Sequence, residues 1–394
     1  MFLKRLAANK NLLHALLATV FFGAAGGILA STMNNFLSDV HQLDAASRGW
    51  LEFPRELPGF LMLFIAGAML VIWTETRIAA LAMFFMAAGA LGFAFHSPSY
   101  AWLVAFTIIG SVGDHIIFTV EGPIGLRLAK SGKEGRRLGQ FGGARNLGTI
   151  AGVAVIYAFS KLFGDNYAVF YSITALCSIV AGVLYFRIRM ADEQGGRSRR
   201  FVFKRKYSLF YAISALFGVR KQIFIVFGAW VLIKVHGVPV STMALLFFVA
   251  AALGVVFRPL LGDIIDWAGE RAVLVTEEFF LLLVCLAYAF SSDLLPKPFD
   301  LWLLYATYVL DSVLFALRIA RTTYLKKIAD HPSDITPTLA VGLTIDHVVS
   351  MLIPILSGYI WVACGFRWVF VLAAVIALGG MALCARIPAK LPAS

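Results

Sequence analysis

Residues 258–271 read RPLLGDIIDWAGER, and this short polar segment lies between two long apolar runs. Gly262 permits close contact between helices and Gly269 permits a sharp turn, because glycine has no Cβ atom. Asp266 is expected at the end of the first helix, and Arg271 follows the turn. A carboxylate and a guanidinium held at such a turn can lock two helix bundles together on the cytoplasmic side. The segment therefore predicts a tight loop between two membrane-spanning helices.

The composition of the whole chain agrees with this prediction. Hydrophobic residues make up 60% of the 394 residues and charged residues 14%, whereas a soluble domain carries roughly 25% charged residues. The mean hydropathy is +0.84. The apolar runs are long and continuous, which argues against the short alternating strands of a β-barrel. We therefore expect an all-α integral membrane protein.

The net charge of +12 and the cysteines do not indicate another class of protein. A basic excess is typical of nucleic-acid-binding proteins, but membrane proteins acquire it through their cytoplasmic loops. The four cysteines lie in apolar runs without C-x-x-C spacing, which supports neither a disulfide framework nor a metal site. We expect no nucleic-acid partner, no metal and no cofactor.

Twelve apolar runs are long enough to cross the membrane, since a helix needs about 20 residues for this. The first half contains runs at 12–37, 49–73, 77–95, 101–127, 138–162 and 167–189. The second half contains runs at 207–234, 239–261, 271–291, 300–325, 335–362 and 366–386. Two equal halves indicate an internal duplication. The predicted organisation is an N-terminal six-helix bundle at 1–189, a basic cytoplasmic linker at 190–206 and a C-terminal six-helix bundle at 207–394.

The placement of lysine and arginine predicts the orientation of the chain. With the N-terminus inside, the cytoplasmic segments hold 23 of the 34 lysines and arginines, and the opposite loops hold five. Because positive residues favour the cytoplasmic side, both termini are expected in the cytoplasm. We therefore predict a multi-pass protein of the cytoplasmic (inner) membrane.

The loop at 258–271 resembles the G-x-x-x-D-x-x-G-x-R/K signature of the major facilitator superfamily. The corresponding loop after the second span, at 67–77, lacks the aspartate and the second glycine. Twelve spans in two halves with a basic central loop are similar to the same family over the whole chain. The resemblance implies a secondary transporter whose first, fourth, seventh and tenth spans line a central cavity. It also implies a cytoplasmic gate loop made of Arg258, Gly262, Asp266, Gly269 and Arg271.

Ionisable residues inside the spans of the first half point to a polar path, because such residues are costly in lipid and usually face a cavity. Asp114 lies near the middle of the fourth span, and Glu121 follows two helical turns later on the same face. Arg145 lies in the fifth span at a depth similar to that of Glu121. We expect a Glu121–Arg145 pair, which serves either as a structural lock or as a substrate contact.

Two adjacent cations in the seventh span, Arg220 and Lys221, allow two interpretations. Either 207–219 forms an interfacial helix and the span begins after Arg220, or the cations lie in the middle of the span. The apolar run at 222–233 has only twelve residues, which is too short to cross the membrane. This favours cations in mid-span, where they suit an anionic group.

The dipeptide Asp-His occurs twice near the centre of a span, as Asp114-His115 and Asp346-His347. Histidine titrates close to neutral pH, and burial brings aspartate towards the same range, so that these pairs suit proton exchange. Adjacent helix residues point about 100° apart, and the two members need not touch. Metal ligation by the two histidines is a weaker alternative, because no third ligand lies at helical spacing.

A further group of polar residues is expected at the outer mouth. Glu52, Arg55 and Glu56 have i, i+3 and i+4 spacing and can pair along their helix. They form either an outer gate or a solvated helix end. Asn34 and Asn35 on the first span offer amide hydrogen bonds in the same region.

Together these features predict a secondary active transporter that moves a small organic, anionic solute and is coupled to protons. A lipid or lysolipid flippase of the same fold and a non-transporting receptor or scaffold are the alternatives. No G-x-x-x-x-G-K-[ST] motif and no nucleophile–base arrangement occurs, so we expect neither an ATP-driven motor nor an enzyme. The chain is expected to be a monomer in the bilayer. The residues expected on the substrate or proton path are Asp114, His115, Glu121, Arg145, Arg220, Asp311, Arg318, Asp346 and His347.

Overall fold

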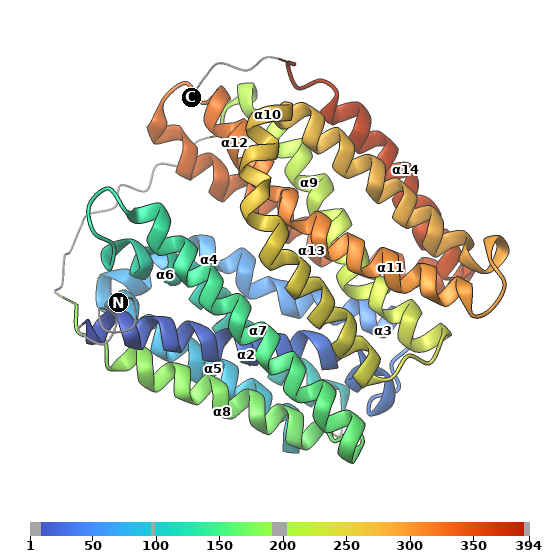
Figure 1. Cartoon of the computed structure of the whole chain (residues 1–394), viewed down its shortest axis with the longest axis horizontal. Helices are drawn as coiled ribbons and strands as arrows, with labels where there is room; N and C mark the ends of the chain where they lie inside the picture. The colour runs from blue at the N-terminus through green and yellow to red at the C-terminus, as the bar shows by residue number, and fades with distance from the viewer. Residues whose placement is uncertain (1–8, 96–98, 191–202, 390–394) are drawn as a thin grey trace. The chain divides into compact units, whose positions relative to one another are not determined.

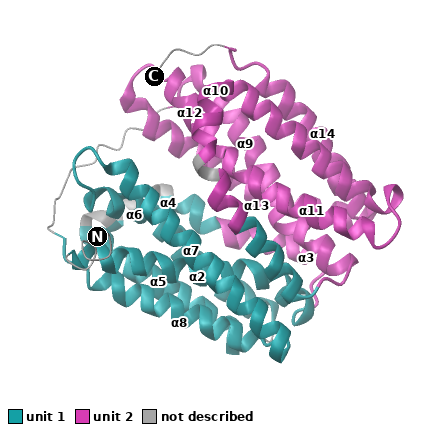
Figure 2. Ribbon diagram, viewed as in Figure 1, with its two compact units in different colours: residues 1–41, 57–196, 239–251 teal, residues 42–56, 197–238, 252–394 magenta. Residues whose placement is uncertain are grey.

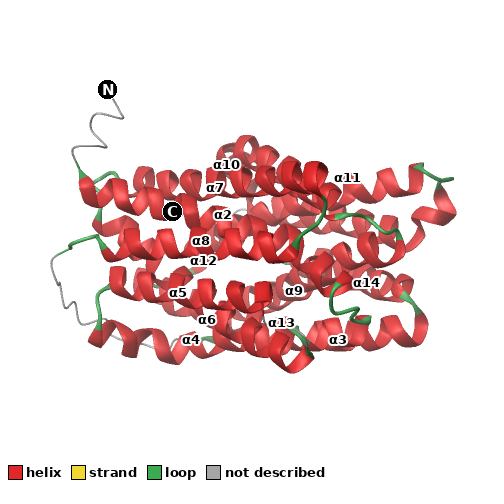
Figure 3. Ribbon diagram, turned by 90° about the horizontal axis from the view of Figure 1, so that it is seen from below, coloured by secondary structure: helices red, strands yellow, loops and turns green. Residues whose placement is uncertain are grey.

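The structure is a computed structural model that describes residues 9–95, 99–190 and 203–389, apart from the side chains at 63–68, 70, 71, 258 and 259. All secondary structure in the described residues is helical, and Figure 3 shows helices joined by short loops. The predicted all-α fold class is confirmed. Most of the predicted basic linker at 190–206 lies outside the described residues.

The helices of the first half follow the predicted spans closely. Polar residues cap three of them, because the side chains of Asn9, Ser99 and Asn166 accept hydrogen bonds from backbone N–H groups in the first turn. A short helix not expected from the sequence, α3 (Ala45–Trp50), precedes the second span. The longer helices are α2 (Lys10–Asp39), α4 (Glu52–Ile72), α5 (Glu75–Phe95), α6 (Tyr100–Arg127), α7 (Glu134–Phe163) and α8 (Tyr167–Phe186) (Figure 1).

The helices of the second half are less regular. The seventh span combines the 3-10 turn η1 (Arg205–Tyr207), α9 (Ser208–Gln222) and two π-helical stretches, η2 (Ile223–Gly228) and η3 (Val231–Val235). The tenth span combines α11 (Phe299–Leu314), the 3-10 turn η4 (Phe315–Arg318) and α12 (Ile319–Ile328). The remaining helices are α10 (Val240–Leu294), α13 (Pro332–Cys364) and α14 (Phe366–Cys384).

Helix α10 contains two spans that meet at a sharp turn. Gly269 has φ 79° and ψ 157°, and it interrupts a helix that otherwise continues on both sides. The predicted turn at Gly269 is therefore confirmed. The first of the two helices extends further than the predicted end at residue 261, because α10 keeps helical backbone angles up to Gly269.

Eleven helices in the described part of the chain are long and apolar enough to cross a membrane. Helix α4, at the position of the second predicted span, has 21 residues, but several of its side chains lie outside the described set. The eleven helices and α4 correspond one to one with the twelve predicted spans. The protein is thus a multi-pass α-helical membrane protein.

The chain folds into two compact units, shown in different colours in Figure 2. Unit 1 contains residues 1–41, 57–196 and 239–251, and unit 2 contains residues 42–56, 197–238 and 252–394. The core of unit 1 is apolar and includes Phe22, Met83 and Ile117. The core of unit 2 includes Tyr207 and Leu261. The division of the sequence at 189 and 207 remains a prediction.

Helices α2 and α7 of unit 1 approach closely because small residues line their contact. A Cβ atom built at Gly148 of α7 would lie 1.9 Å from the carbonyl oxygen of Val20 on α2. No side chain fits in that space. The contact places Arg145, one turn earlier on α7, beside the polar residues of unit 1.

We expect Gly148→Ala to lower the melting temperature of the purified protein, because the added methyl group forces α2 and α7 apart. Overpacking of this kind costs about 1–3 kcal/mol. Gly142→Ala on the same helix is the matched control, since a Cβ there meets no atom within 4 Å. Equal melting temperatures for both variants and the parent would contradict the tight α2–α7 contact.

Candidate functional site

Four side chains of unit 2 form what we call the histidine cluster. Nδ1 of His347 lies 2.9 Å from Oε2 of Glu56. Nζ of Lys221 lies 3.1 Å from Oδ2 of Asp346 and 3.9 Å from the same Glu56 oxygen. All four side chains are at most 12% exposed. Helices α4, α9 and α13 therefore bring a titratable histidine, two carboxylates and an ammonium group together.

Ion pairs extend the histidine cluster along α3 and the first turn of α4. Nη2 of Arg55 lies 2.5 Å from Glu52 and 2.6 Å from Glu56, so the predicted pairing along this helix is confirmed. Nη1 of Arg48 lies 2.6 Å from Glu52. The Gln222 side-chain amide donates to the same carboxylate over 2.8 Å. Because Glu52 is 0% exposed and Glu56 4%, the alternative of a solvated helix end is wrong for these two residues.

A second buried group in unit 2, the arginine cluster, is centred on Arg220. Its Nη1 donates to Glu277 over 2.7 Å and its Nη2 to the Asp311 carboxylate over 3.1 Å. The Arg220 residue is only 4% exposed. It lies halfway along the continuous 31-residue helical segment Arg205–Val235. A separate interfacial helix that ends before Arg220 is not observed.

Three polar residues in or beside these clusters, Glu277, Glu278 and Gln222, were missed by the sequence reasoning. Glu277 and Glu278 are an acidic pair inside the predicted span 271–291, and this signal was available in the sequence. Gln222 directly follows the two charged residues Arg220 and Lys221. An uncharged amide in an apolar run is a weaker signal, although the structure buries it completely.

The predicted ion pair of unit 1 is confirmed, since Arg145 of α7 contacts Glu121 of α6. Thr19 of α2 donates a hydrogen bond to the same carboxylate over 3.3 Å. The Arg145 guanidinium lies 5.0 Å from the ring centroid of Phe22 and 5.1 Å from that of Phe118. Two aromatic faces and a carboxylate thus hold the cation in place.

His115 and Arg318, two other predicted path residues, each contact a side chain on the neighbouring turn of their own helical segment. Nδ1 of His115 lies 3.1 Å from the Ser111 hydroxyl on the preceding turn of α6. Its neighbour Asp114 is half-buried. Arg318 is exposed, and its guanidinium lies 5.3 Å from the ring centroid of Phe315. The outer-mouth residues Asn34 and Asn35 are both buried.

The predicted gate loop differs from expectation at two points. A Cβ at Gly262 would meet no described atom within 4 Å, so the close helix contact expected there is absent. Asp266 and Arg271 are exposed and form no ion pair within the described residues. The ion pair of this turn joins Glu270 to Lys327 over 2.8 Å. The side chain of Arg258 lies outside the described residues.

A polar group lies at the start of the seventh span and includes Lys204 and Asp330, which are outside the membrane-spanning helices. Lys206 binds Asp330, and this ammonium group holds the pKa of the Asp330 carboxyl below its usual range. Lys204 donates to Asp334 over 2.5 Å, and the bond raises the pKa of Lys204. The hydroxyl of Tyr207 donates to Asp334 over 2.8 Å. These contacts fix the beginning of α9 against the beginning of α13.

Comparison with known families identifies the chain. The sequence model of the Major Facilitator Superfamily matches residues 15–335, which is most of the chain. The protein belongs to this superfamily. A comparison with curated protein sequences finds no match.

Solved structures of superfamily transporters have the same fold. A mutant form of the nucleoside transporter NupG matches with a TM-score of 0.77 and 17% identity, covering 95% of this chain and 100% of that one. A bacterial homologue of the human lysosomal transporter Spinster, inward-facing and occupied, matches with a TM-score of 0.72 and 16% identity, covering 96% of each chain. A D-xylose–proton symporter matches with a TM-score of 0.67 and 14% identity, covering 95% and 96%. At these identities the likeness extends to the fold alone.

Proposed function

We propose that this superfamily member is a proton-coupled secondary active transporter for a small organic anion, working by alternating access. The observation that carries the proposal is the buried hydrogen bond between His347 and Glu56, beside the Lys221–Asp346 pair. Histidine is the side chain whose ordinary titration falls nearest physiological pH. Ionisable groups inside membrane helices typically mark solute or proton paths.

The charges of the histidine cluster and its neighbours favour an anionic solute. Three cations and three carboxylates are linked by ion pairs: Arg48, Arg55 and Lys221 with Glu52, Glu56 and Asp346. The group is neutral when His347 is neutral, and a proton on this imidazole leaves one positive charge in excess. That charge is weakly screened, because the surroundings are buried. An anion restores the balance, so that proton and anion each strengthen the binding of the other.

Orientation and location are part of the same proposal. The excess of lysine and arginine in alternate loops, 23 against five, supports cytoplasmic termini and insertion in the cytoplasmic membrane. We also propose that the protein acts as a monomer. The Glu121–Arg145 pair of unit 1 is proposed to belong to the solute path.

The solute class is tested by thermal shift with a panel of small organic anions, cations and neutral compounds. A ligand that binds only the folded protein raises its melting temperature, and we expect anions to do so more strongly at acidic pH. In Lys221→Gln we expect the affinity for the stabilising anion to fall by about tenfold, or about 1.4 kcal/mol.

The matched control for this prediction is Lys327→Gln, which removes an ammonium group at the α10 turn, away from the histidine cluster. It is expected to keep the parental anion affinity. Stabilisation by neutral or cationic compounds alone, or an unchanged shift in Lys221→Gln, would contradict an anionic solute.

A further inference from the structure

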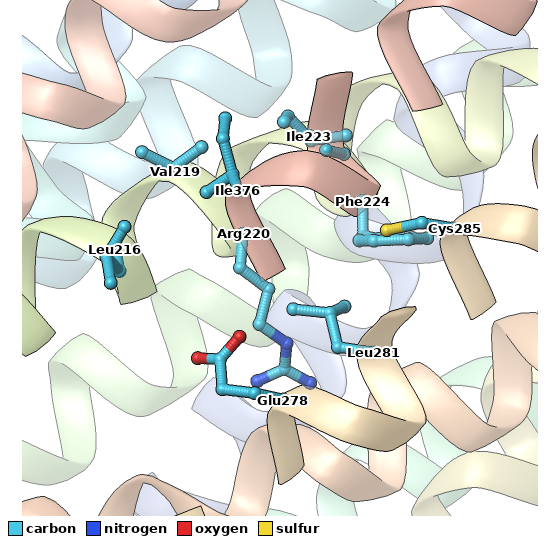
Figure 4. A pocket seen from close by; sticks show the side chains of 10 residues that line it. Leu216, Val219, Arg220, Ile223, Phe224, Glu278, Leu281, Cys285 and Ile376 are labelled. Carbon is cyan, nitrogen blue, oxygen red and sulfur yellow. The ribbon is translucent and has the colours of Figure 1, made fainter. Parts of the chain in front are cut away.

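A small cavity in unit 2 lies between α9 and its π-helical continuation, the second limb of α10, and α14. Its volume is about 10 Å³, which is close to the space that one water molecule needs. Arg220 and Glu278 supply the charged groups of its lining, and the other side chains are apolar apart from the thiol of Cys285. Figure 4 shows the carboxyl of Glu278 beside the guanidinium of Arg220 among these apolar side chains.

The Glu278 carboxyl has no hydrogen-bond or ion-pair partner within the described part of the chain. The terminal nitrogens of Arg220 are directed to Glu277 and Asp311 instead. The other nearby cation, Arg321, lies 3.6 Å from the ring centroid of Phe217. Among the described residues, no cation therefore forms an ion pair with the Glu278 carboxyl group.

Helix α14 makes room for this carboxyl group. A Cβ built at Gly380 would lie 2.6 Å from Oε2 of Glu278 and 2.7 Å from its carboxyl carbon. The carboxyl group thus packs directly on the backbone of a membrane helix. At the adjacent Gly379 a Cβ would meet no atom within 4 Å, so the close contact is specific to one glycine.

A polar atom without a partner also borders the cavity. Nε of Arg220 is buried and has no hydrogen-bond partner in the described residues. A water molecule in the cavity can accept a hydrogen bond from this N–H group and contact the carboxyl of Glu278. Buried waters typically occupy such positions between otherwise unsatisfied polar groups.

The charged groups around Glu278 do not compensate a negative charge on it. The two positive charges of Arg220 and Arg321 balance the two negative charges of Glu277 and Asp311. The nearby thiols of Cys285 and Cys384 carry no charge when protonated. The set is neutral without Glu278, and an ionised Glu278 adds an uncompensated charge. Glu278 is half-buried, and a carboxylate that faces apolar side chains without a paired cation favours the protonated form.

We propose that Glu278 and the adjoining cavity form a proton-binding site that is distinct from the histidine cluster. Its carboxyl group holds an exchangeable proton that comes from bulk water, and one water molecule connects it to Arg220. The site goes beyond the proposed function, because it binds its proton in the absence of solute. It adds a proton-binding carboxyl group on α10 to the histidine of the first cluster.

Infrared difference spectroscopy of the full chain in lipid nanodiscs, without solute, tests this site. The difference between the spectra in neutral and in alkaline buffer reports the C=O stretch of carboxyl groups that are protonated at neutral pH and lose the proton at alkaline pH. We expect such a band in the parent protein and its loss in Glu278→Gln. Asp293→Asn is the control on the same helix, because Asp293 is half exposed and paired with Arg367, and it is expected to keep the band.

A second pair of variants keeps the test decisive if Glu278→Gln does not fold. Gly380→Ala is expected to shift the titration midpoint of the band, because it displaces the carboxyl group, while Gly379→Ala leaves the midpoint unchanged. A parent spectrum without the band, a full band in Glu278→Gln, or equal midpoints in both alanine variants would overturn the proposal. The assay contains no solute, so its failure is separate from a failure of proton-coupled transport.

Discussion

Replacing Arg220 by leucine is expected to destabilise unit 2 more than any other single change considered for this protein. The substitution leaves Glu277 and Asp311 without their shared cation, and the two side chains are only 5% and 15% exposed. Breaking a buried ion pair by removal of one partner costs about 3–5 kcal/mol, because an uncompensated charge stays buried. We expect a large fall in the melting temperature and a low yield of monodisperse protein.

Two further variants show whether the charge is the cause. Arg367→Leu removes a cation whose partner Asp293 is half exposed, and such a surface pair contributes about 0–1 kcal/mol. In the combined variant Arg220→Leu, Glu277→Gln and Asp311→Asn, part of the lost stability is expected to return. If Arg220→Leu melts at the parental temperature, the arginine cluster does not stabilise the fold.

Replacing His347 by glutamine is expected to uncouple transport from the proton gradient. Glutamine keeps a polar group near Glu56, but it cannot carry a proton at neutral pH. For one proton per solute, a gradient of one pH unit supports up to about tenfold accumulation of the solute. In proteoliposomes that hold His347→Gln, we expect this accumulation to disappear, while exchange of solute in the absence of a gradient continues.

His331→Gln is the matched control, because His331 is exposed in the turn before α13 and contacts Ser333. It is expected to keep the parental accumulation. Should His347→Gln still accumulate solute in response to the gradient, the proton is carried elsewhere and the role assigned to the histidine cluster is wrong.

Contacts that follow from helical spacing or from the depth of a residue in its span could be predicted from the sequence. Arg55 pairs with Glu52 on α4 because i+3 spacing places the two side chains on one face of the helix. Arg145 meets Glu121 because the two lie at equal depth in consecutive antiparallel spans. The turn at Gly269 followed from the need for a residue that tolerates positive φ.

Contacts between segments that are far apart in the chain could not be predicted from the sequence in this way. The bond between Glu56 and His347 joins residues 291 positions apart, and nothing in one sequence states which helices of a bundle pack together. Glu56 was therefore assigned to an outer mouth and His347 to a proton path, although they share one hydrogen bond. A close helix contact was predicted at Gly262 because glycine lacks a Cβ atom, whereas a Cβ at this position would meet no described atom within 4 Å.

The most direct test of the proton-coupled anion transporter is uptake into proteoliposomes that contain the purified parent protein. The stabilising anion is supplied outside, with and without an inward proton gradient, and internal pH is recorded at the same time. We predict that the gradient drives accumulation of the anion, that the interior acidifies as the solute enters, and that a protonophore abolishes both. Uptake that is independent of the gradient and leaves internal pH unchanged would contradict the proposal.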